Sequence, residues 1–127
     1  MKKMAEKITS FTQLRTWQNA REFAVQVYRF TERFPSGERF GLTSQMRRSS
    51  VSVPANIAEG FSRNTAKDKA NFYSMALGSL TETASHAYIA ADLGYLKDDI
   101  LQQMIHTTDD LHRMINGLIK TAQGRNA

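Results

Sequence analysis

Residues 42–60 read Leu42-Thr-Ser-Gln-Met-Arg-Arg-Ser-Ser-Val-Ser-Val-Pro-Ala-Asn-Ile-Ala-Glu-Gly60, and two rows of side chains at helical spacing run through them. Positions three or four residues apart lie on the same face of an α-helix. The first row is apolar or small and comprises Leu42, Met46, Ser49, Val53, Ile57 and Gly60. The second row is polar and comprises Gln45, Arg48, Ser52, Asn56, Glu59 and Arg63. The stretch therefore predicts a helix with its apolar row on a core and a polar row beside it.

The remaining surface of this helix is small and apolar. A solvated helix face normally carries charged residues, but here only Arg47 does. The other members of the face are Ser44, Val51, Ala55 and Ala58. We therefore expect these four residues to contact other copies of the chain, and the protein to be a homo-oligomer.

Pro54 lies inside the predicted helix. Proline removes one backbone donor and crowds the carbonyl one turn earlier, so it bends a helix or ends it. The sequence predicts a bend near residues 50–53, close to Pro54. A break into two shorter helices is the alternative.

Three further segments have helical periodicity, and none alternates as a strand does. Helices are expected at about residues 12–34, 42–62, 66–93 and 98–121, with boundaries set by Pro35, by Thr65 and Asp68 as a capping box, and by Gly94. Short connections between such helices predict an all-α, antiparallel up-down-up-down four-helix bundle over residues 11–122. A flexible basic arm, residues 1–10, and a frayed tail, residues 123–127, complete the expected organisation.

Composition excludes several classes of protein. A chain of 127 residues with 41% hydrophobic residues suits one domain with a single core. The absence of cysteine excludes disulfides, thiolate metal sites and a cysteine nucleophile. No apolar run is long enough to cross a bilayer, and the first residues lack the apolar segment of a secretory signal. We expect a cytoplasmic protein without a membrane partner.

The positive charge is concentrated in the first half of the chain. The net charge is +5, and residues 1–63 contain 11 Lys or Arg against 5 Asp or Glu. Such asymmetry indicates contact with nucleic acid or another acidic partner in some proteins, and in others it only keeps the protein soluble.

No constellation typical of an enzyme stands out, so we expect no catalytic, cofactor-binding or metal-binding residues. Ser52 has no histidine on its own row to activate it, and Glu59, Glu82 and His86 form only a weak acid–base arrangement. A di-iron bundle needs Glu-x-x-His pairs, which the chain lacks. The remaining possible ligands are expected at the surface, and they are His106, Asp109, Asp110 and His112.

The polar row has two interpretations. In the structural one, Arg48 and Arg63 pair with Glu59 or Glu82, and the amide and hydroxyl side chains satisfy one another across helices or subunits. In the functional one, the arginines meet phosphate. We favour the structural interpretation, because a carboxylate within a phosphate site is unfavourable. Arg47 points off the row and is the better candidate for a ligand contact.

Three blocks of the sequence resemble those of a known family. They are residues 40–60 with the blocks Gln-x-x-Arg and Asn-Ile-Ala-Glu-Gly, then Gly78-Ser-Leu-Thr-Glu82, then Leu93-Gly-Tyr-Leu96. They are similar to bacterial four-helix-bundle proteins of the 23S rRNA intervening-sequence type, over about residues 11–118. The resemblance implies a bundle assembled into a ring-shaped homo-oligomer, a homopentamer. It also relates the chain to accessory variability determinants, which bind a reverse transcriptase and nucleic acid in diversity-generating retroelements.

The resemblance assigns no catalytic role to its motif positions. On this chain those positions are Gln45, Arg48, Ser52, Asn56, Glu59, Gly60, Gly78, Ser79 and Glu82, which we interpret with Arg63 as structural. Nucleic-acid contact is instead expected from basic residues outside the motif. These are Lys2, Lys3, Lys7, Arg15, Arg29, Arg33, Arg39 and Arg47.

These observations predict a non-enzymatic, oligomeric binding module that contacts RNA or other nucleic acid through a basic surface. The alternative is a structural adaptor that recruits a protein, for example a reverse transcriptase, without touching nucleic acid. Salt distinguishes the two, because phosphate contacts release counterions and therefore weaken steeply with salt.

Overall fold

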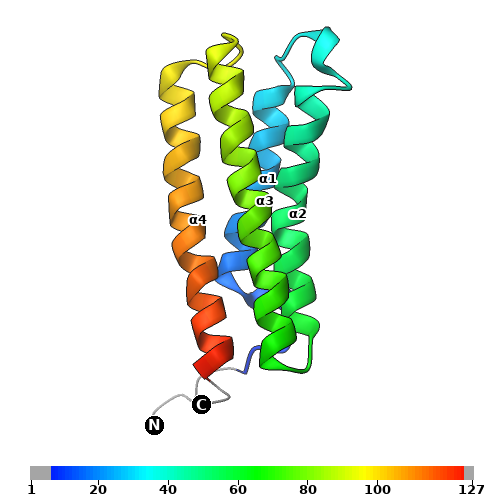
Figure 1. Ribbon diagram of the computed structural model, residues 1–127, viewed down its shortest axis with the longest axis vertical. Coiled ribbons are helices and arrows are strands. Elements are labelled where there is room, and N and C mark those ends of the chain that lie inside the picture. The colour runs from blue at the N-terminus through cyan, green and yellow to red at the C-terminus, as the bar shows by residue number, and fades with distance from the viewer. Residues whose placement is uncertain (1–6, 125–127) are drawn as a thin grey trace.

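The computed structural model describes residues 7–124, where every element of regular structure is helical. Four α-helices lie side by side along the long axis (Figure 1), with one 3-10 turn before α1 and another between α1 and α2. The α-helices are α1 (Arg15–Thr31), α2 (Leu42–Ser62), α3 (Ala66–Asp92) and α4 (Asp98–Gly124). The 3-10 turns are η1 (Phe11–Gln13) and η2 (Ser36–Glu38). The all-α, four-helix prediction is therefore confirmed.

The core follows the helical periodicity of each segment. On α2 the buried residues include Met46, Ser49, Val53, Ile57 and Gly60, which are five of the six positions of the predicted apolar row. Each of the other helices contributes a similar line of buried residues at three- and four-residue steps. The largest fully buried apolar side chains are Phe23, Val27, Met46, Val53, Ile57, Leu80, Leu111 and Ile115.

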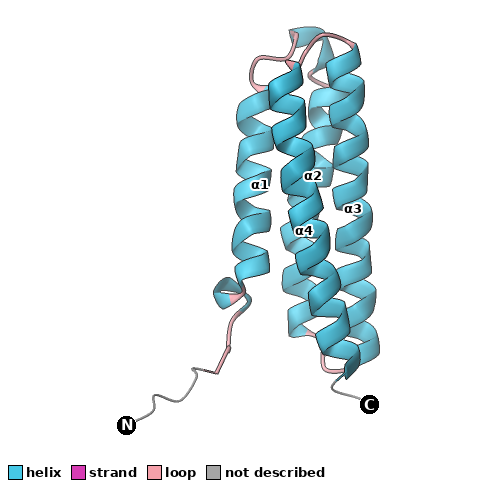
Figure 2. Ribbon diagram, turned by 90° about the vertical axis from the view of Figure 1, so that its left-hand side faces the viewer, coloured by secondary structure: helices cyan, strands magenta, loops and turns pink. Residues whose placement is uncertain are grey.

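The first helix is shorter than its sequence pattern predicts. Leu14 has extended backbone, with φ −72° and ψ 123°, and separates η1 from α1. The helix ends at Thr31, and Pro35 disfavours helical backbone at the residue before it. Figure 2 shows η1 at the lower end of α1. Trp17 and Tyr28 lie at the helical spacing of the α1 core residues, but Trp17 is half-buried and Tyr28 is exposed.

Helix α2 is continuous through Pro54, so the alternative of two shorter helices is wrong. Proline cannot donate to the carbonyl of Ser50, one turn earlier. Nearby serines bond to other carbonyls: the Ser49 hydroxyl donates to Met46 O at 3.2 Å and the Ser50 hydroxyl to Arg47 O at 3.0 Å. These bonds are local and keep both hydroxyls satisfied in a buried position.

Residues close to each end of α3 determine where this helix begins and ends. The Thr65 hydroxyl accepts a hydrogen bond from Asp68 N at 3.1 Å and caps the start of the helix. At the other end Gly94 has φ +81°, and the Tyr95 and Gly94 amides donate to the carbonyls of Ala90 and Ala91 at 2.9 Å. Helix α4 extends one turn beyond the expected end and includes Gln123 and Gly124. Residues 1–6 and 125–127 lie outside the described part of the chain.

Candidate functional site

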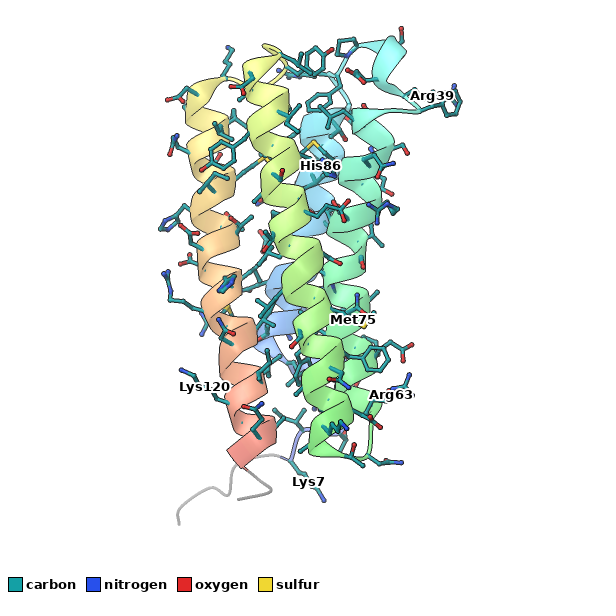
Figure 3. All side chains as sticks on the ribbon, in the orientation of Figure 1. Lys7, Arg39, Arg63, Met75, His86 and Lys120 are labelled. Atoms are coloured by element: carbon teal, nitrogen blue, oxygen red, sulfur yellow. The ribbon has the colours of Figure 1, made fainter. Side chains whose placement is uncertain are left out.

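The upper part of the polar row forms a charged cluster between α2 and α3. Arg48 pairs with Glu82 through its Nη2 atom, and the same nitrogen donates to Gln45 Oε1 at 3.1 Å. The Glu82 Oε2 atom also lies 3.0 Å from Nε2 of His86, one turn further along α3. One carboxylate therefore receives two nitrogen side chains, and Figure 3 shows His86 on this face of α3.

The electrostatic environment of Glu82 follows from these contacts. The hydrogen bond from His86 lowers the pKa of this carboxyl below its ordinary value of 4.5, and the Arg48 charge acts in the same direction against partial desolvation. The charged form of Glu82 is thus the one that the cluster favours.

Neutral hydrogen bonds continue the row between the same two helices. The Ser79 hydroxyl donates to Ser52 Oγ at 2.9 Å, and the Asn56 amide donates to the same oxygen at 3.1 Å. One layer deeper, the Ser49 and Thr83 hydroxyls are 2.7 Å apart in a fully buried position. Buried pairs of this kind fix which residues of two helices face each other. They support the structural interpretation of the row.

The last two members of the polar row, Glu59 and Arg63, form an ion pair at the end of α2. Arg63 Nη2 lies 3.1 Å from Glu59 Oε2, and the Arg63 guanidinium also covers the Phe72 ring at 4.4 Å. Both charged side chains are exposed. Arg48 and Arg63 therefore each form an ion pair with a carboxylate.

The weak catalytic arrangement does not come together as a nucleophile and base. The Ser52 hydroxyl is held by Ser79 and Asn56. His86 lies seven residues beyond Ser79 on α3, which is about 10 Å along the helix axis. Glu82, not Ser52, is the partner of His86.

Arg47 is held against α1. Its Nε atom donates to the Thr31 hydroxyl at 2.8 Å, Nη2 donates to the Tyr28 carbonyl at 3.3 Å, and the guanidinium lies 4.5 Å from the centre of the Tyr28 ring. The side chain is half-buried. These contacts link α2 to the end of α1. Arg47 therefore stabilises the packing of these two helices, in addition to any contact with a ligand.

The other basic residues predicted to contact nucleic acid are spread along the molecule. Lys2 and Lys3 lie outside the described residues, whereas Lys7, Arg15, Arg29, Arg33 and Arg39 are all exposed. Figure 3 places Lys7 at the lower end of the bundle and Arg39 at the upper end. Within residues 7–124, none of these five forms an ion pair, although Arg39 covers the Phe40 ring.

Arg29 and Arg33 line a hollow at the upper end of the bundle. Its volume is about 470 Å³, and its wall also includes Phe30, Tyr95 and Lys97. The hollow lies between the end of α1 on one side and the α3–α4 connection with the first turn of α4 on the other. It brings together residues more than 60 positions apart in the sequence.

Comparison with known proteins identifies the family. The model of the 23S rRNA-intervening sequence protein family matches residues 12–117, which is most of the chain. The chain belongs to this family. The resemblance predicted from residues 40–60 and the two later blocks is therefore confirmed.

A solved structure has the same fold as this chain. It comes from Bacteroides thetaiotaomicron and is described as a protein with unknown function from the S23 ribosomal protein family. The two share 21% sequence identity with a TM-score of 0.76, over 83% of this chain and 95% of that one. At this identity the likeness shows the fold alone. A comparison with curated proteins found no match.

The predicted interface residues of α2 are largely accessible. In the single chain Ser44, Val51 and Ala55 are exposed and Ala58 is half-buried. Exposed apolar side chains also occur on α3, where Met75 and Ile89 are 54% and 47% exposed. A Cβ atom at Gly78 would meet no atom within 4 Å, so no helix of the same chain approaches this glycine closely.

Among residues 7–124, no group of three or more His, Asp or Glu side chains is arranged to hold a metal ion. In the same part of the chain, no helix is both long and apolar enough to cross a membrane.

Sequence reasoning missed Lys97, Phe30 and Tyr95 as neighbours of Arg29 and Arg33. A signal for them does exist. Gly94 ends α3. In an antiparallel bundle, the α3–α4 connection lies at the same end of the bundle as the last turn of α1. Residues 95–97 could therefore have been placed beside residues 29–33.

Proposed function

We propose that this protein is a non-enzymatic, oligomeric binding module that contacts RNA through exposed arginines on α1 and just after it. The proposal combines the observed positions of the basic residues with the family resemblance. The names of both families refer to the ribosome or its RNA, which makes RNA the first nucleic acid to test. The proposed site of action is the cytoplasm.

One observation carries the proposal: the basic residues divide into two groups. Arg48 and Arg63 are paired with Glu82 and Glu59, so binding phosphate there would first require breaking those pairs. Arg15, Arg29 and Arg33 are exposed and form no ion pair with any other described residue. An unpaired arginine can bind a phosphate with two parallel hydrogen bonds.

Arg15 and Arg29 lie along one side of α1, and Arg33 follows two residues after the last residue of that helix, Thr31. Arg15 and Arg29 are 14 residues apart, which is almost a whole number of helical turns, so they lie on the same side of α1 about 21 Å apart. With Arg33 just beyond the helix they form the arginine row. Glu22 lies in the same row, between the outer arginines, and is the acidic member. A row of this length can contact the backbone of RNA at several phosphates.

The proposed unit is an antiparallel up-down-up-down bundle with α2 bent near Pro54, and the proposed assembly is a ring of five copies. The α2 face of Ser44, Val51, Ala55 and Ala58, of which the first three are exposed, would contact the next copy, because small and apolar residues lose little on burial. A closed ring repeats each arginine row once per subunit. Several weak contacts would then act together on one RNA.

Fluorescence anisotropy with a labelled structured RNA and a labelled DNA duplex, measured over a series of salt concentrations, tests this function. The proposal predicts RNA binding whose affinity falls linearly on a log–log plot, because each phosphate contact releases counterions. Absence of binding at low salt, or binding that does not change with salt, would contradict it.

A structural adaptor for a protein partner is the second candidate. The exposed apolar side chains Val51, Met75 and Ile89 favour it, because such side chains beside a polar row are typical of protein interfaces. A nucleic-acid-bound protein, such as a reverse transcriptase, is the partner that the family resemblance implies. If this candidate is right, the protein would still bind its protein partner at a salt concentration at which RNA dissociates.

A further inference from the structure

The hollow at the upper end of the bundle has the chemistry of a ligand site. It lies between the last turns of α1 and the residues that join α3 to α4. Its volume of about 470 Å³ is within the range of pockets that hold small molecules. Its walls come from two separate parts of the chain, so the fold itself positions them.

The charge of this hollow favours an anion. Three cationic side chains line it, namely Arg29, Arg33 and Lys97, against one carboxylate, Asp99. Among the described residues none of the three cations forms an ion pair. Asp99 Oδ1 accepts a hydrogen bond from the Ile100 amide at 3.0 Å. Three unpaired cations around one cavity repel one another, and a bound anion would relieve that repulsion.

The hollow also has aromatic walls, which an inorganic anion would not use. Phe30 and Tyr95 are half-buried and line it. Tyr95 is fixed in place, because its hydroxyl donates to Glu38 Oε2 at 2.9 Å and its ring packs on Phe34 at 5.4 Å between centroids. The bond to Glu38 raises the pKa of the Tyr95 phenol above its ordinary value, so the hydroxyl remains a donor. A rigid aromatic wall beside cations suits a ligand with a flat ring and a negative charge.

We propose that this hollow binds a nucleoside phosphate, with the base against Phe30 and Tyr95 and the phosphate on Arg29, Arg33 and Lys97. The second oxygen of Asp99 can accept a hydrogen bond from a ribose hydroxyl or a base amino group. Two sources offer this chemistry: a free nucleotide, and an unpaired nucleotide of an RNA. The second source rests on the proposed function, because it assigns a base-reading pocket to the upper end of the arginine row.

Titration of the full chain with nucleoside monophosphates, with the corresponding nucleosides and with inorganic phosphate tests the free-nucleotide source, using calorimetry. Anisotropy with a single-stranded RNA and with an RNA duplex of the same length tests the RNA source. Lys97→Gln is the test variant and Lys120→Gln is the control, since both lysines are exposed and only Lys97 lines the hollow. Circular dichroism verifies that both variants are folded.

We expect Lys97→Gln to weaken binding of the monophosphate, of the single-stranded RNA, or of both by about fivefold to tenfold. This change in affinity is typical of the loss of one charge-assisted hydrogen bond. Lys120→Gln should leave these affinities unchanged. A loss confined to free monophosphates identifies a free nucleotide as the ligand, and a loss confined to single-stranded RNA identifies an unpaired nucleotide.

Equal affinities of the two variants for every probe would overturn the pocket proposal. If wild-type protein still binds RNA with steep salt dependence in that case, the arginine row remains and only the pocket fails. Binding of monophosphate without any RNA binding would instead contradict the proposed function while keeping the pocket.

Discussion

Gly60 and Gly78 are glycines on facing helices with opposite surroundings. A Cβ atom at Gly60 would lie 2.6 Å from Cε1 of the buried Tyr73 ring and 3.2 Å from the Lys69 carbonyl. The same addition at Gly78 would meet nothing within 4 Å. The close packing of α2 on α3 therefore depends on the first glycine and not on the second.

Alanine at these two positions should change stability in opposite directions. Gly60→Ala should lower the free energy of unfolding by about 1–3 kcal/mol, because the Tyr73 ring must move. Gly78→Ala in the dissociated chain should raise it by about 0.5–1 kcal/mol, since alanine favours a helix over glycine. Urea denaturation measures both, and equal effects of the two substitutions would show that the packing described at Gly60 is incorrect.

The cluster around Glu82 predicts a dependence of stability on pH. Its pKa is lowered in the folded protein, so its contribution is present above the ordinary pKa of 4.5 and is lost as pH falls through the lowered value. Glu82 is 38% exposed, so solvent screening reduces the contribution. Glu82→Gln should therefore cost only about 0.5–1 kcal/mol at neutral pH, and nothing once the wild-type carboxyl is protonated.

Urea denaturation of wild-type protein and Glu82→Gln between about pH 7 and pH 3 checks this expectation. Asp109→Asn is a suitable control. Asp109 is exposed, and its side chain forms no hydrogen bond or ion pair with another described residue. A difference between wild type and Glu82→Gln that stays constant over the whole range would contradict the role of the charged carboxylate.

At the scale of single elements, the helices could be predicted because their signals are local. The apolar row of α2 and the Thr65 cap are read from residues three or four positions apart. The start of α1 could not be placed, because Leu14 is apolar yet has extended backbone, and Phe11 packs on Trp17 from outside the helix. Tyr28 fits the core pattern of α1 but lies beneath Arg47, which comes from α2.

The Thr65 cap predicts a measurable loss at the start of α3. Thr65→Ala removes the oxygen that accepts from Asp68 N, so the free energy of unfolding should fall by about 0.5–2 kcal/mol. Ser74→Ala, at an exposed position inside α3, is the control and should be neutral or slightly stabilising. If both substitutions have the same effect in chemical denaturation, the hydroxyl of Thr65 is not acting as a cap.

At the scale of the whole molecule, much of the candidate site could not be predicted from local pattern. The hollow joins residues 29–33 to residues 95–99, and only the packed bundle brings these together. Arg47 was the favoured ligand contact because it lies off the polar row, but the neighbouring Thr31 and Tyr28 hold it. A residue's position on its own helix says little about which neighbouring helix will bind its side chain.

The proposed assembly makes a prediction at the same scale. Val51 is 44% exposed in the single chain, so Val51→Glu should leave the isolated bundle folded. At a subunit interface, however, the new charge would be buried without a partner and should dissociate the oligomer. Light scattering coupled to size exclusion measures the mass, with Gln103→Glu on the exposed surface of α4 as the control. An unchanged mass for Val51→Glu would show that this face of α2 is free.

The most direct test of the account is the salt dependence of RNA affinity in two matched double variants. Arg15→Gln with Arg33→Gln removes two charges from the arginine row, and Lys67→Gln with Lys120→Gln removes two exposed charges elsewhere. We predict that the first variant binds more weakly and has a log–log salt slope shallower by about one for each lost phosphate contact, while the second keeps the wild-type slope. Identical slopes for the two variants would contradict the assignment of RNA binding to the arginine row.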